Sequence, residues 1–433
     1  MSEAWPHLWL NRRLRLPPEA RPGPEELRAY QLDLLRMTLA NVSQSSPFYR
    51  GRIGSVLSKH GLPEALADLA ALPRTTADDL RRDPHAFLCV SQDEVARAVS
   101  LQSSGTTGPG KRVFFTAGDL ERTVDFFAHG MLGLMGCGET ALILLPGDRP
   151  DSVGRLLAQA LDRFGGKGLI HGPLGRDSGD PATALETILE QDVSCLVGCP
   201  AHLNTLATHW RERGLGPGRV RSILACWDVL PGSLLRNLRG IFGCRCLTHW
   251  GMIETCLGGG VECREDSGAH LREPDIYVEI ADPDTGRTLP DGEWGEILVT
   301  TLSRRAMPLI RYRTGDLGRI LPGVCVCNSP LRRLDRVPGR LDENQLLAEM
   351  GETLYALPGL ADFRAERAGE RLLLRISAAG NIAGVRRAAV RAMERIGEEY
   401  ALKVEIQDAG PGPAEPGLAK RRVHEAAEQK EQA

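Results

Sequence analysis

Hydrophobic positions follow a helical period in some stretches of the chain and form short uninterrupted runs in others. Leu27, Tyr30 and Leu34 recur at helical spacing, whereas the run from Ala141 to Leu145 is ended by Pro146, which is typical of a buried strand. The pattern predicts helices over 24–41, 118–135, 151–164 and 200–213 and strands over 141–146, 193–198 and 220–226. Strands and helices that alternate at this spacing indicate a largely parallel sheet covered on both faces.

The pattern changes after residue 275. Strands are predicted at 276–280 and 296–301 with Asp-Gly turns between them, which favours a β-rich subdomain. Beyond a break near 339–342, a strand at 371–377, a helix at 382–399 and a strand at 402–408 form a small α+β unit. The predicted fold class is α/β, with a large domain of several subdomains over 1–340, a small α+β domain over 341–410 and a polar, flexible tail over 411–433.

Composition narrows the class of protein. With 433 residues, 42% of them hydrophobic, and a net charge of -3, the chain is expected to be a soluble globular protein that binds neither nucleic acid nor an anionic membrane. No apolar run approaches the roughly 18–20 residues that span a bilayer, and we expect no signal peptide. The eleven cysteines are scattered and odd in number, which favours a reducing cytoplasm over a disulfide framework.

One glycine-rich stretch carries the strongest chemical signal. It runs through Ser103, Ser104, Gly105, Thr106, Thr107, Gly108, Pro109, Gly110 and Lys111. Glycines bring backbone N–H groups close to a ligand, the hydroxyls add donors and the lysine adds a charge, so a polyphosphate is the expected ligand. A P-loop is disfavoured because Arg112 replaces the Mg²⁺-binding hydroxyl and residues 113–116 predict a strand instead of a helix. A simple surface loop is the structural alternative.

Three later constellations fit the same nucleotide site. Trp250-Gly251 precedes Glu254; the aromatic ring suits a purine and the carboxylate suits Mg²⁺. Asp316 ends a strand in a tight turn, where its carboxylate suits the two hydroxyls of a ribose, and Arg340 lies near the domain break. Each alone is a weak signal because charged positions are usually solvated. Their order and spacing make the case together.

The order of these motifs resembles the adenylate-forming superfamily, and within it the phenylacetate–CoA ligases most closely. The stretches that carry the resemblance are Ser103 to Lys111, Trp250 to Glu254, Ala306 to Asp316 and Gly339-Arg340, with Ser46 to Arg50 and Leu72 to Arg81 nearer the N-terminus. The resemblance covers roughly residues 5 to 345. It implies an AMP-forming CoA ligase that activates a small carboxylic acid with ATP and transfers the acyl group to coenzyme A, with aromatic acids among the candidate substrates.

The resemblance also implies roles for single residues. The glycine loop would hold the β- and γ-phosphates, Glu254 would bind Mg²⁺ and Trp250 would cover the adenine. Asp316 would hold the ribose, Arg340 would contact ribose or phosphate, and Asp342 would be the hinge of the small domain. A homodimer is the assembly that relatives suggest.

Three departures from the family pattern leave alternatives open. Ile253 replaces the hydroxyl residue that relatives carry before the glutamate, and the loop after Arg340 is shortened. Gly417-Leu418 stands where relatives have Gly-Lys, so either Lys420 supplies the catalytic cation from a shifted register or the adenylation step lacks it. The alternatives to a CoA ligase are a degenerate nucleotide- or acyl-binding member of the family and an adenylating enzyme with another acceptor.

A second metal site is predicted from cysteine and histidine positions. Cys263, His270, Cys325 and Cys327 form a tetrahedral zinc set, with buried thiols and a surface histidine as the alternative reading. Some phenylacetate–CoA ligases carry cysteines and a histidine at the same places, which favours zinc. Four protein ligands leave no open position, so the zinc would be structural.

Overall fold

The computed structural model describes residues 4–101, 110–175, 179–341, 345–410, 413–414, 418 and 420–425. The chain divides into two compact units: unit 1 is Met1–Gly133 with His249–Leu341, and unit 2 is Leu134–Thr248 with Asp342–Ala433. In the described part of the chain, no helix combines the length and the apolar character needed to cross a membrane.

Unit 1 begins with helices and short 3₁₀ turns. These are α1 (Trp5–Leu14), α2 (Pro24–Ser45), α3 (Pro47–His60), η1 (Leu66–Ala71), α4 (Ala77–Arg82), η2 (Pro84–Phe87) and η3 (Gln92–Glu94). Helix α2 confirms the helix predicted over 24–41. It starts at a proline and carries Glu25 and Glu26 in its first turn, and both features favour a helix N-terminus.

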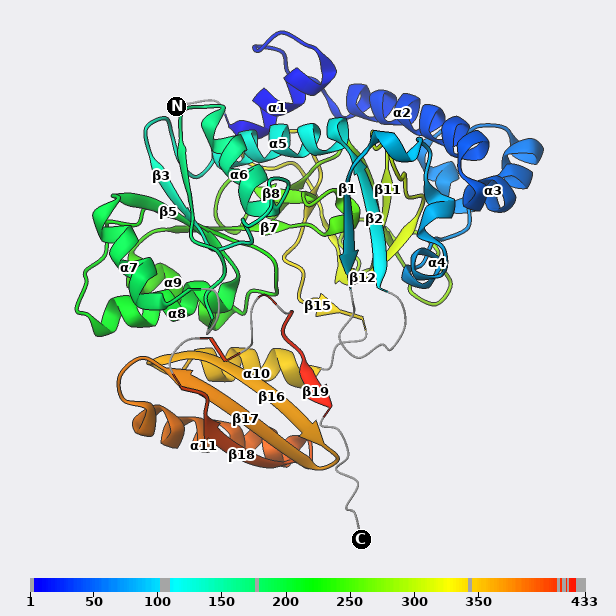
Figure 1. Cartoon of the computed structure of the whole chain (residues 1–433). Helices are drawn as coiled ribbons and strands as arrows, with labels where there is room; N and C mark the ends of the chain where they lie inside the picture. Colours follow the sequence, from blue (N-terminus) through cyan, green and yellow to red (C-terminus); the bar gives the residue numbers. More distant parts are fainter. Residues whose placement is uncertain are drawn as a thin grey trace. The chain divides into compact units, whose positions relative to one another are not determined.

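A hairpin flanks the glycine loop. β1 (Val95–Leu101) pairs antiparallel with β2 (Lys111–Thr116), and the two strands lie side by side in Figure 1. This confirms the strand predicted over 113–116. β2 is a strand because Val113, Phe114 and Phe115 are all buried in the core of unit 1. Helix α5 (Ala117–Met131) follows directly, with Thr116 and Asp119 forming its capping box.

Two antiparallel sheets complete unit 1. The first has the order β10 (Ile276–Ala281), β11 (Gly295–Thr301), β12 (Tyr312–Gly318), β15 (Gly339–Arg340). The second joins β8 (Gly260–Glu262), β9 (Ala269–Leu271), β14 (Arg333–Leu334) and β13 (Ile320–Leu321) to the end of β7 (Arg245–Trp250), after which the turn η4 (Ile253–Thr255) follows. The β-rich texture predicted after residue 275 is therefore confirmed.

The first part of unit 2 is a parallel sheet. Its order is β4 (Lys167–Ile170), β3 (Thr140–Ile143), β5 (Val193–Gly198), β6 (Ser222–Ala225) and the beginning of β7, and each pair is parallel. The connecting helices are α6 (Val153–Asp162), α7 (Pro181–Glu190), α8 (Pro200–Glu212) and α9 (Gly232–Phe242). The predicted alternation of strands and helices is confirmed.

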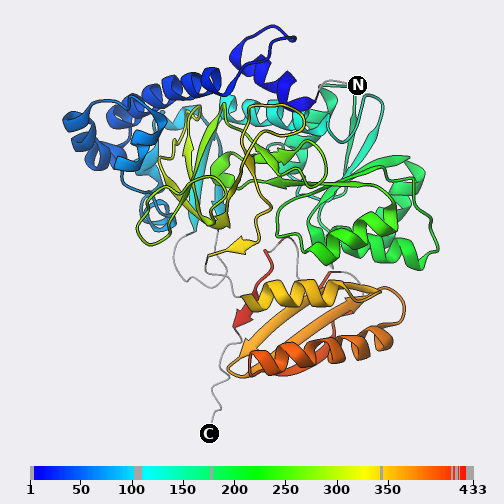
Figure 2. The ribbon, with the colours of Figure 1, turned by 180° about the vertical axis from the view of Figure 1, so that it is seen from behind.

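The second part of unit 2 is a four-stranded sheet with two helices. Its order is β18 (Lys403–Asp408), β17 (Arg371–Ala378), β16 (Leu360–Ala368), β19 (Val423–Glu425), and α10 (Gln345–Tyr355) and α11 (Ile382–Glu399) lie on the same face in Figure 2. Within the segment predicted as a flexible tail, residues 423–425 instead form a strand, because they pair with β16. The boundaries at 340/341 and 410/411 stay a prediction.

Candidate active site

Three segments meet at the carboxylate of Glu254 in unit 1. The ammonium of Lys111, at the start of β2, forms an ion pair with Glu254 Oε1. The hydroxyl of Tyr312, at the start of β12, donates a hydrogen bond to the same oxygen at 2.7 Å. Lys111 Nζ also lies 3.3 Å from the Tyr312 hydroxyl oxygen. The glutamate side chain is only 3% exposed, so these contacts replace its hydration.

The charge state of Glu254 follows from these contacts. Burial alone would raise the pKa of its carboxyl, but the charge and hydrogen bond of Lys111 and the hydrogen bond from Tyr312 outweigh it and hold the pKa below the ordinary value. Glu254 is therefore an ionised carboxylate at neutral pH. A single buried carboxylate is a donor that Mg²⁺ accepts when substrate phosphates supply the other oxygens.

A second group lies around Asp316. Trp250 Nε1 donates to Asp316 Oδ2 at 3.1 Å, and Arg340 Nη1 lies 3.5 Å from Asp316 Oδ1. The pairing of β12 with β15 puts Asp316 opposite Arg340, which explains how the arginine reaches the carboxylate. The structure thus brings Trp250, Asp316 and Arg340 together, as their motifs led us to expect.

Two glycines in these motifs are required by close packing. A Cβ on Gly251 would lie 2.7 Å from the carbonyl oxygen of Leu257. Gly315 has φ +75°, and a Cβ there would lie 2.5 Å from Arg340 Nη2. Both glycines therefore let backbone and side chains approach more closely than an alanine would allow.

The remaining predicted residues belong to undescribed segments or to unit 2. Ser103, Ser104, Gly105, Thr106, Thr107 and Gly108 lie outside the described residues, as does the predicted hinge residue Asp342. Lys420 is exposed and belongs to unit 2, where it directly precedes Arg421. Its assignment as the catalytic cation stays a prediction.

The four predicted zinc ligands form one cluster in unit 1. The ligand atoms of Cys263, His270, Cys325 and Cys327 all lie within 4.8 Å of one another. Cys263 Sγ is 3.7 Å from Cys325 Sγ, and Cys327 Sγ is 3.3 Å from His270 Nε2. Tetrahedral zinc with Zn–S of about 2.3 Å and Zn–N of about 2.0 Å needs ligand atoms roughly 3.5–3.8 Å apart, so the cluster fits zinc.

The surroundings of the cluster also suit a metal. His270 Nδ1 lies 3.2 Å from the carbonyl oxygen of Leu331, a contact that places a proton on Nδ1, and Nε2 faces Cys327. Hydrogen bonds from Cys263 and Cys327 lower the pKa of the Cys325 thiol, and contacts with Cys325 and Cys327 raise the pKa of the Cys263 thiol, so the thiols of the cluster titrate together as one group.

Sequence reasoning assigned no role to two residues that contact Glu254. Tyr312 lies between Arg311 and Arg313 inside a recognised motif, and only its hydroxyl hinted at a polar partner. Arg304 lies two positions before the recognised stretch that starts at Ala306. It is 7% exposed, and its Nη1 donates to the carbonyl oxygen of Glu254 at 2.9 Å.

Comparison with known proteins gives a consistent result. Residues 90–303 match the family model described as AMP-binding enzyme. The chain is 30% identical over 337 residues to phenylacetate-coenzyme A ligase of Pseudomonas putida, covering 76% of this chain and 74% of that protein. It is 32% identical over 358 residues to phenylacetate-coenzyme A ligase of Thermus thermophilus, with the same 76% and 74% coverage.

The fold is shared with solved structures. A 2-hydroxyisobutyryl-CoA ligase in the postadenylation state superposes with a TM-score of 0.76 at 20% identity, covering 94% of this chain and 91% of that one. At this identity the likeness concerns the fold, and it confirms the predicted α/β architecture.

Proposed function

Because the chain belongs to the adenylate-forming superfamily, in its phenylacetate–CoA ligase-like branch, we propose that it joins a small carboxylic acid to coenzyme A with ATP. The enzyme class that its relatives support is the AMP-forming acyl-CoA ligase. The observation that carries the proposal is the buried cluster of Lys111, Glu254 and Tyr312, because it unites three motifs of the nucleotide site around one ionised carboxylate.

The reaction has two steps. A carboxylate oxygen of the acid attacks the α-phosphorus of ATP, the bond to pyrophosphate breaks, and an acyl-adenylate forms. The sulfur of coenzyme A then attacks the acyl carbonyl carbon, the thiol proton is released and AMP leaves. The demands on the protein are alignment of the attacking oxygen and stabilisation of negative charge on the phosphates.

The site residues are suited to these demands. We assign Glu254 as the Mg²⁺ ligand; the ion, when bound, neutralises phosphate charge. Lys111 then exchanges its contact with Glu254 for the phosphates that the preceding glycine loop holds. Trp250, Asp316 and Arg340 hold the nucleoside, with Asp316 exchanging the indole N–H for the ribose hydroxyls. The ionised state of Glu254 and the contacts around Asp316 support these assignments.

The acid is a small one, and arylacetates are the first class to test, since the curated relatives named above are phenylacetate ligases. We further propose that the enzyme works in the cytoplasm, in keeping with its eleven free cysteines, and that it forms a homodimer.

A structural zinc completes the proposal. Cys263, His270, Cys325 and Cys327 would hold the ion and tie β8 and β9 to the segment that follows β13. The distances and the proton position on His270 support zinc. The site has no open position for substrate, so no catalytic role is assigned to it.

The experiment that tests the function is pyrophosphate release from ATP and Mg²⁺ across a panel of small carboxylic acids, with and without coenzyme A. Release that depends on one acid class and rises with coenzyme A is the expected result. Release without any effect of coenzyme A would mean another acceptor. Nucleotide binding without release from any acid would favour the degenerate reading that Leu418 and Ile253 raise.

A further inference from the structure

The backbone that carries Glu254 is held in an unusual conformation. Glu254 is the middle residue of a three-residue 3₁₀ turn. The two residues that follow the turn, Cys256 and Leu257, have φ of 57° and 68°. Two consecutive non-glycine residues in the left-handed region are rare and persist only where the surroundings hold them. The position of the Glu254 carboxylate therefore depends on groups that anchor this turn.

Arg304 is one such anchor. Its Nη1 donates to the carbonyl oxygen of Glu254 at 2.9 Å, and its Nη2 donates to the carbonyl oxygen of Phe114 at 3.1 Å. The guanidinium also lies over the ring of Phe115 at 4.5 Å from the centroid. Phe114 and Lys111 are both in β2, so one side chain joins the strand that carries the ammonium to the turn that carries the carboxylate.

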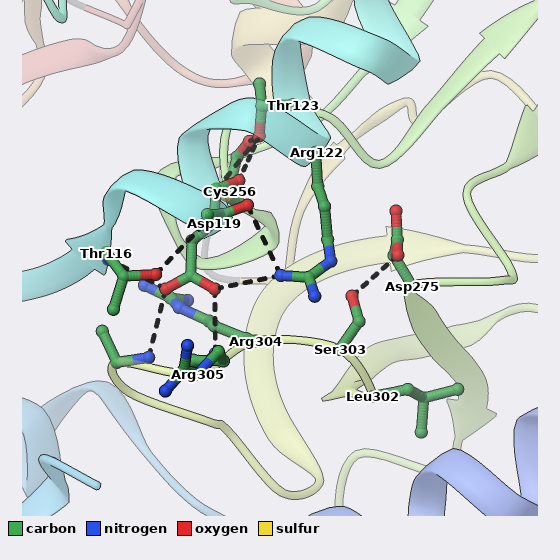
Figure 3. Close-up of polar contacts among 12 residues, drawn as sticks. Thr116, Asp119, Arg122, Thr123, Cys256, Asp275, Leu302, Ser303, Arg304 and Arg305 are labelled. Carbon is green, nitrogen blue, oxygen red and sulfur yellow. Dashed lines mark hydrogen bonds and ion pairs between the residues drawn. The ribbon is translucent and has the colours of Figure 1, made fainter. Parts of the chain in front are cut away.

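Asp119 holds the segment that presents Arg304. Its Oδ1 accepts the backbone N–H of Arg305 at 2.8 Å, and its Oδ2 accepts the backbone N–H groups of Ala306 and Thr116 at 3.1 and 2.9 Å. Figure 3 shows this carboxylate at the centre of the contacts. The backbone on the C-terminal side of Arg304 is thus fixed to the N-terminus of α5. This fixes the position from which the Arg304 side chain extends.

Thr123 holds the far side of the turn. Its hydroxyl donates to the carbonyl oxygen of Cys256 at 2.7 Å, as Figure 3 shows. Arg304 holds a carbonyl group before the two left-handed residues, and Thr123 holds the carbonyl group of the first of them. Together the two contacts leave the turn little freedom to rotate. The two anchors come from different elements, so each can be tested separately.

We propose that Arg304 is a positioning residue for the Mg²⁺ site, a role that rests on the proposed function of Glu254. It bridges two backbone carbonyls and so sets the separation between Lys111 and the Glu254 carboxylate. A flexible turn would let the carboxylate move away from the ion, and the cost would appear in Mg²⁺ affinity. Contacts to the nucleoside through Trp250 and Asp316 do not involve Arg304, so binding of nucleotide without the metal is expected to stay unchanged.

The test uses the full-length protein and a fluorescent ATP analogue, with Mg²⁺ titrated from an EDTA baseline. For Arg304→Met we expect the Mg²⁺ concentration at half-saturation to rise about tenfold, which corresponds to about 1.4 kcal/mol. Arg304→Lys, which retains a cation able to reach a carbonyl, is expected to recover part of the loss. Arg305→Met is the matched control, because that neighbouring side chain is 63% exposed and pairs with Glu94.

Thermal unfolding of each variant separates positioning from stability. A residue that only stabilises the fold would lower the melting temperature of Arg304→Met and leave the Mg²⁺ half-saturation of the folded fraction within twofold of the parent, and that result would overturn the proposal. If Arg304→Met does not fold, Arg304→Lys and Arg304→Gln decide by the same titration.

A second measurement keeps the positioning role separate from the proposed function. Hydrogen exchange at the amides of Thr255, Cys256 and Leu257, which are all hydrogen-bonded in the turn, is expected to accelerate at least tenfold in the Arg304 variants and to stay unchanged in Arg305→Met. If nucleotide binding by the parent protein does not respond to Mg²⁺, the assignment of Glu254 as the Mg²⁺ ligand is wrong. The exchange rates still decide whether Arg304 holds the turn.

Discussion

Lys111 and Glu254 form an ion pair in unit 1 although 143 positions separate them in the chain. The glutamate side chain is 3% exposed and the lysine side chain 17% exposed, so the pair is largely removed from solvent. Breaking such a pair by removing one partner leaves an uncompensated charge, and its effects are larger than those of a surface ion pair.

Removing the lysine should change the pH range over which the site binds Mg²⁺. The pKa of Glu254 is held low by Lys111 against the opposing effect of burial. In Lys111→Met burial acts with less opposition, so the pKa of Glu254 rises and the carboxylate takes up a proton at higher pH. When the pH is lowered from 8 to 5, Mg²⁺-dependent nucleotide binding should therefore be lost at a higher pH in Lys111→Met than in the parent.

Lys111→Arg retains the positive charge and is the control for this shift. The loss of Mg²⁺-dependent nucleotide binding on acidification (the acid limb of the pH profile) should occur at nearly the same pH in Lys111→Arg as in the parent, even if the affinity for phosphate falls. An acid limb in Lys111→Met that coincides with that of the parent would contradict the assignment of Lys111 as the group that controls Glu254.

His249 should make the protein lose stability at mildly acid pH. Burial, together with the charge of Arg272, lowers the pKa of His249 to about 4, and its Nε2 has no partner among the described residues. The unfolded chain has a histidine pKa near 6.5 and binds more protons between these values, so this contribution falls as pH drops from about 6.5 to 4. The loss amounts to at most about 3.4 kcal/mol.

Urea unfolding of the parent and of His249→Gln at several pH values measures this contribution. The difference in unfolding free energy between the two proteins should change with pH in that window. His60→Gln is the control because His60 is exposed. A difference that stays constant between pH 4.5 and 7 would show that His249 is not buried as a neutral imidazole.

Periodicity and motif chemistry predicted much of the fold because the relevant signals are local. The strand after the glycine loop followed from Val113, Phe114 and Phe115, and helix α2 followed from apolar spacing between prolines. The strand β19 was missed because three residues in a polar segment give no periodic signal. It pairs with β16, and Arg421, just before it, forms an ion pair with Asp362 near the start of β16.

Motif spacing likewise predicted which residues belong to the candidate sites, but it did not predict the contacts between them. The set Cys263, His270, Cys325 and Cys327 could be proposed because metal-ligating residue types are few. The link from Arg304 to the carbonyl of Glu254 could not, because a backbone acceptor has no signature in the sequence and an arginine near a motif is usually solvated. Such links depend on tertiary packing alone.

The ion pair between Arg421 and Asp362 should be among the large single contributions to the stability of unit 2. Asp362 is 0% exposed, Arg421 is 13% exposed, and the guanidinium lies 4.3 Å from the ring centroid of Phe363. Arg421→Met removes the positive charge beside a buried carboxylate that keeps hydrogen bonds from Tyr355 and the Ala414 N–H, so the unfolding free energy at pH 7 should fall by about 3–5 kcal/mol. Arg371→Met, which removes an exposed ion pair with Glu405, should cost at most about 1 kcal/mol.

The sign of the pH dependence checks the cause. Burial raises the pKa of Asp362, but Arg421 outweighs it and the pKa is lowered, so the pair contributes stability above the unfolded aspartate pKa of about 3.9 and loses it as pH falls. In Arg421→Met the aspartate is protonated more easily, and the gap between the two proteins should narrow at acid pH. A gap that stays constant as the pH falls would mean that Arg421 acts through packing and not through charge.

Removal of the proposed zinc should destabilise unit 1. The four ligands come from two segments of the chain, Cys263 and His270 from one and Cys325 and Cys327 from the other, so a bound ion cross-links them and its binding energy adds to folding. The purified protein should contain about one zinc per chain, and a strong chelator should lower the melting temperature by several degrees. Cys327→Ser should lower both the zinc content and the melting temperature, and chelator should then have little further effect.

Cys137→Ser is the matched control because that cysteine is exposed and lies outside the cluster. Zinc content well below one per chain, together with a melting temperature that chelator leaves unchanged, would mean that the four residues are ordinary buried thiols and an imidazole.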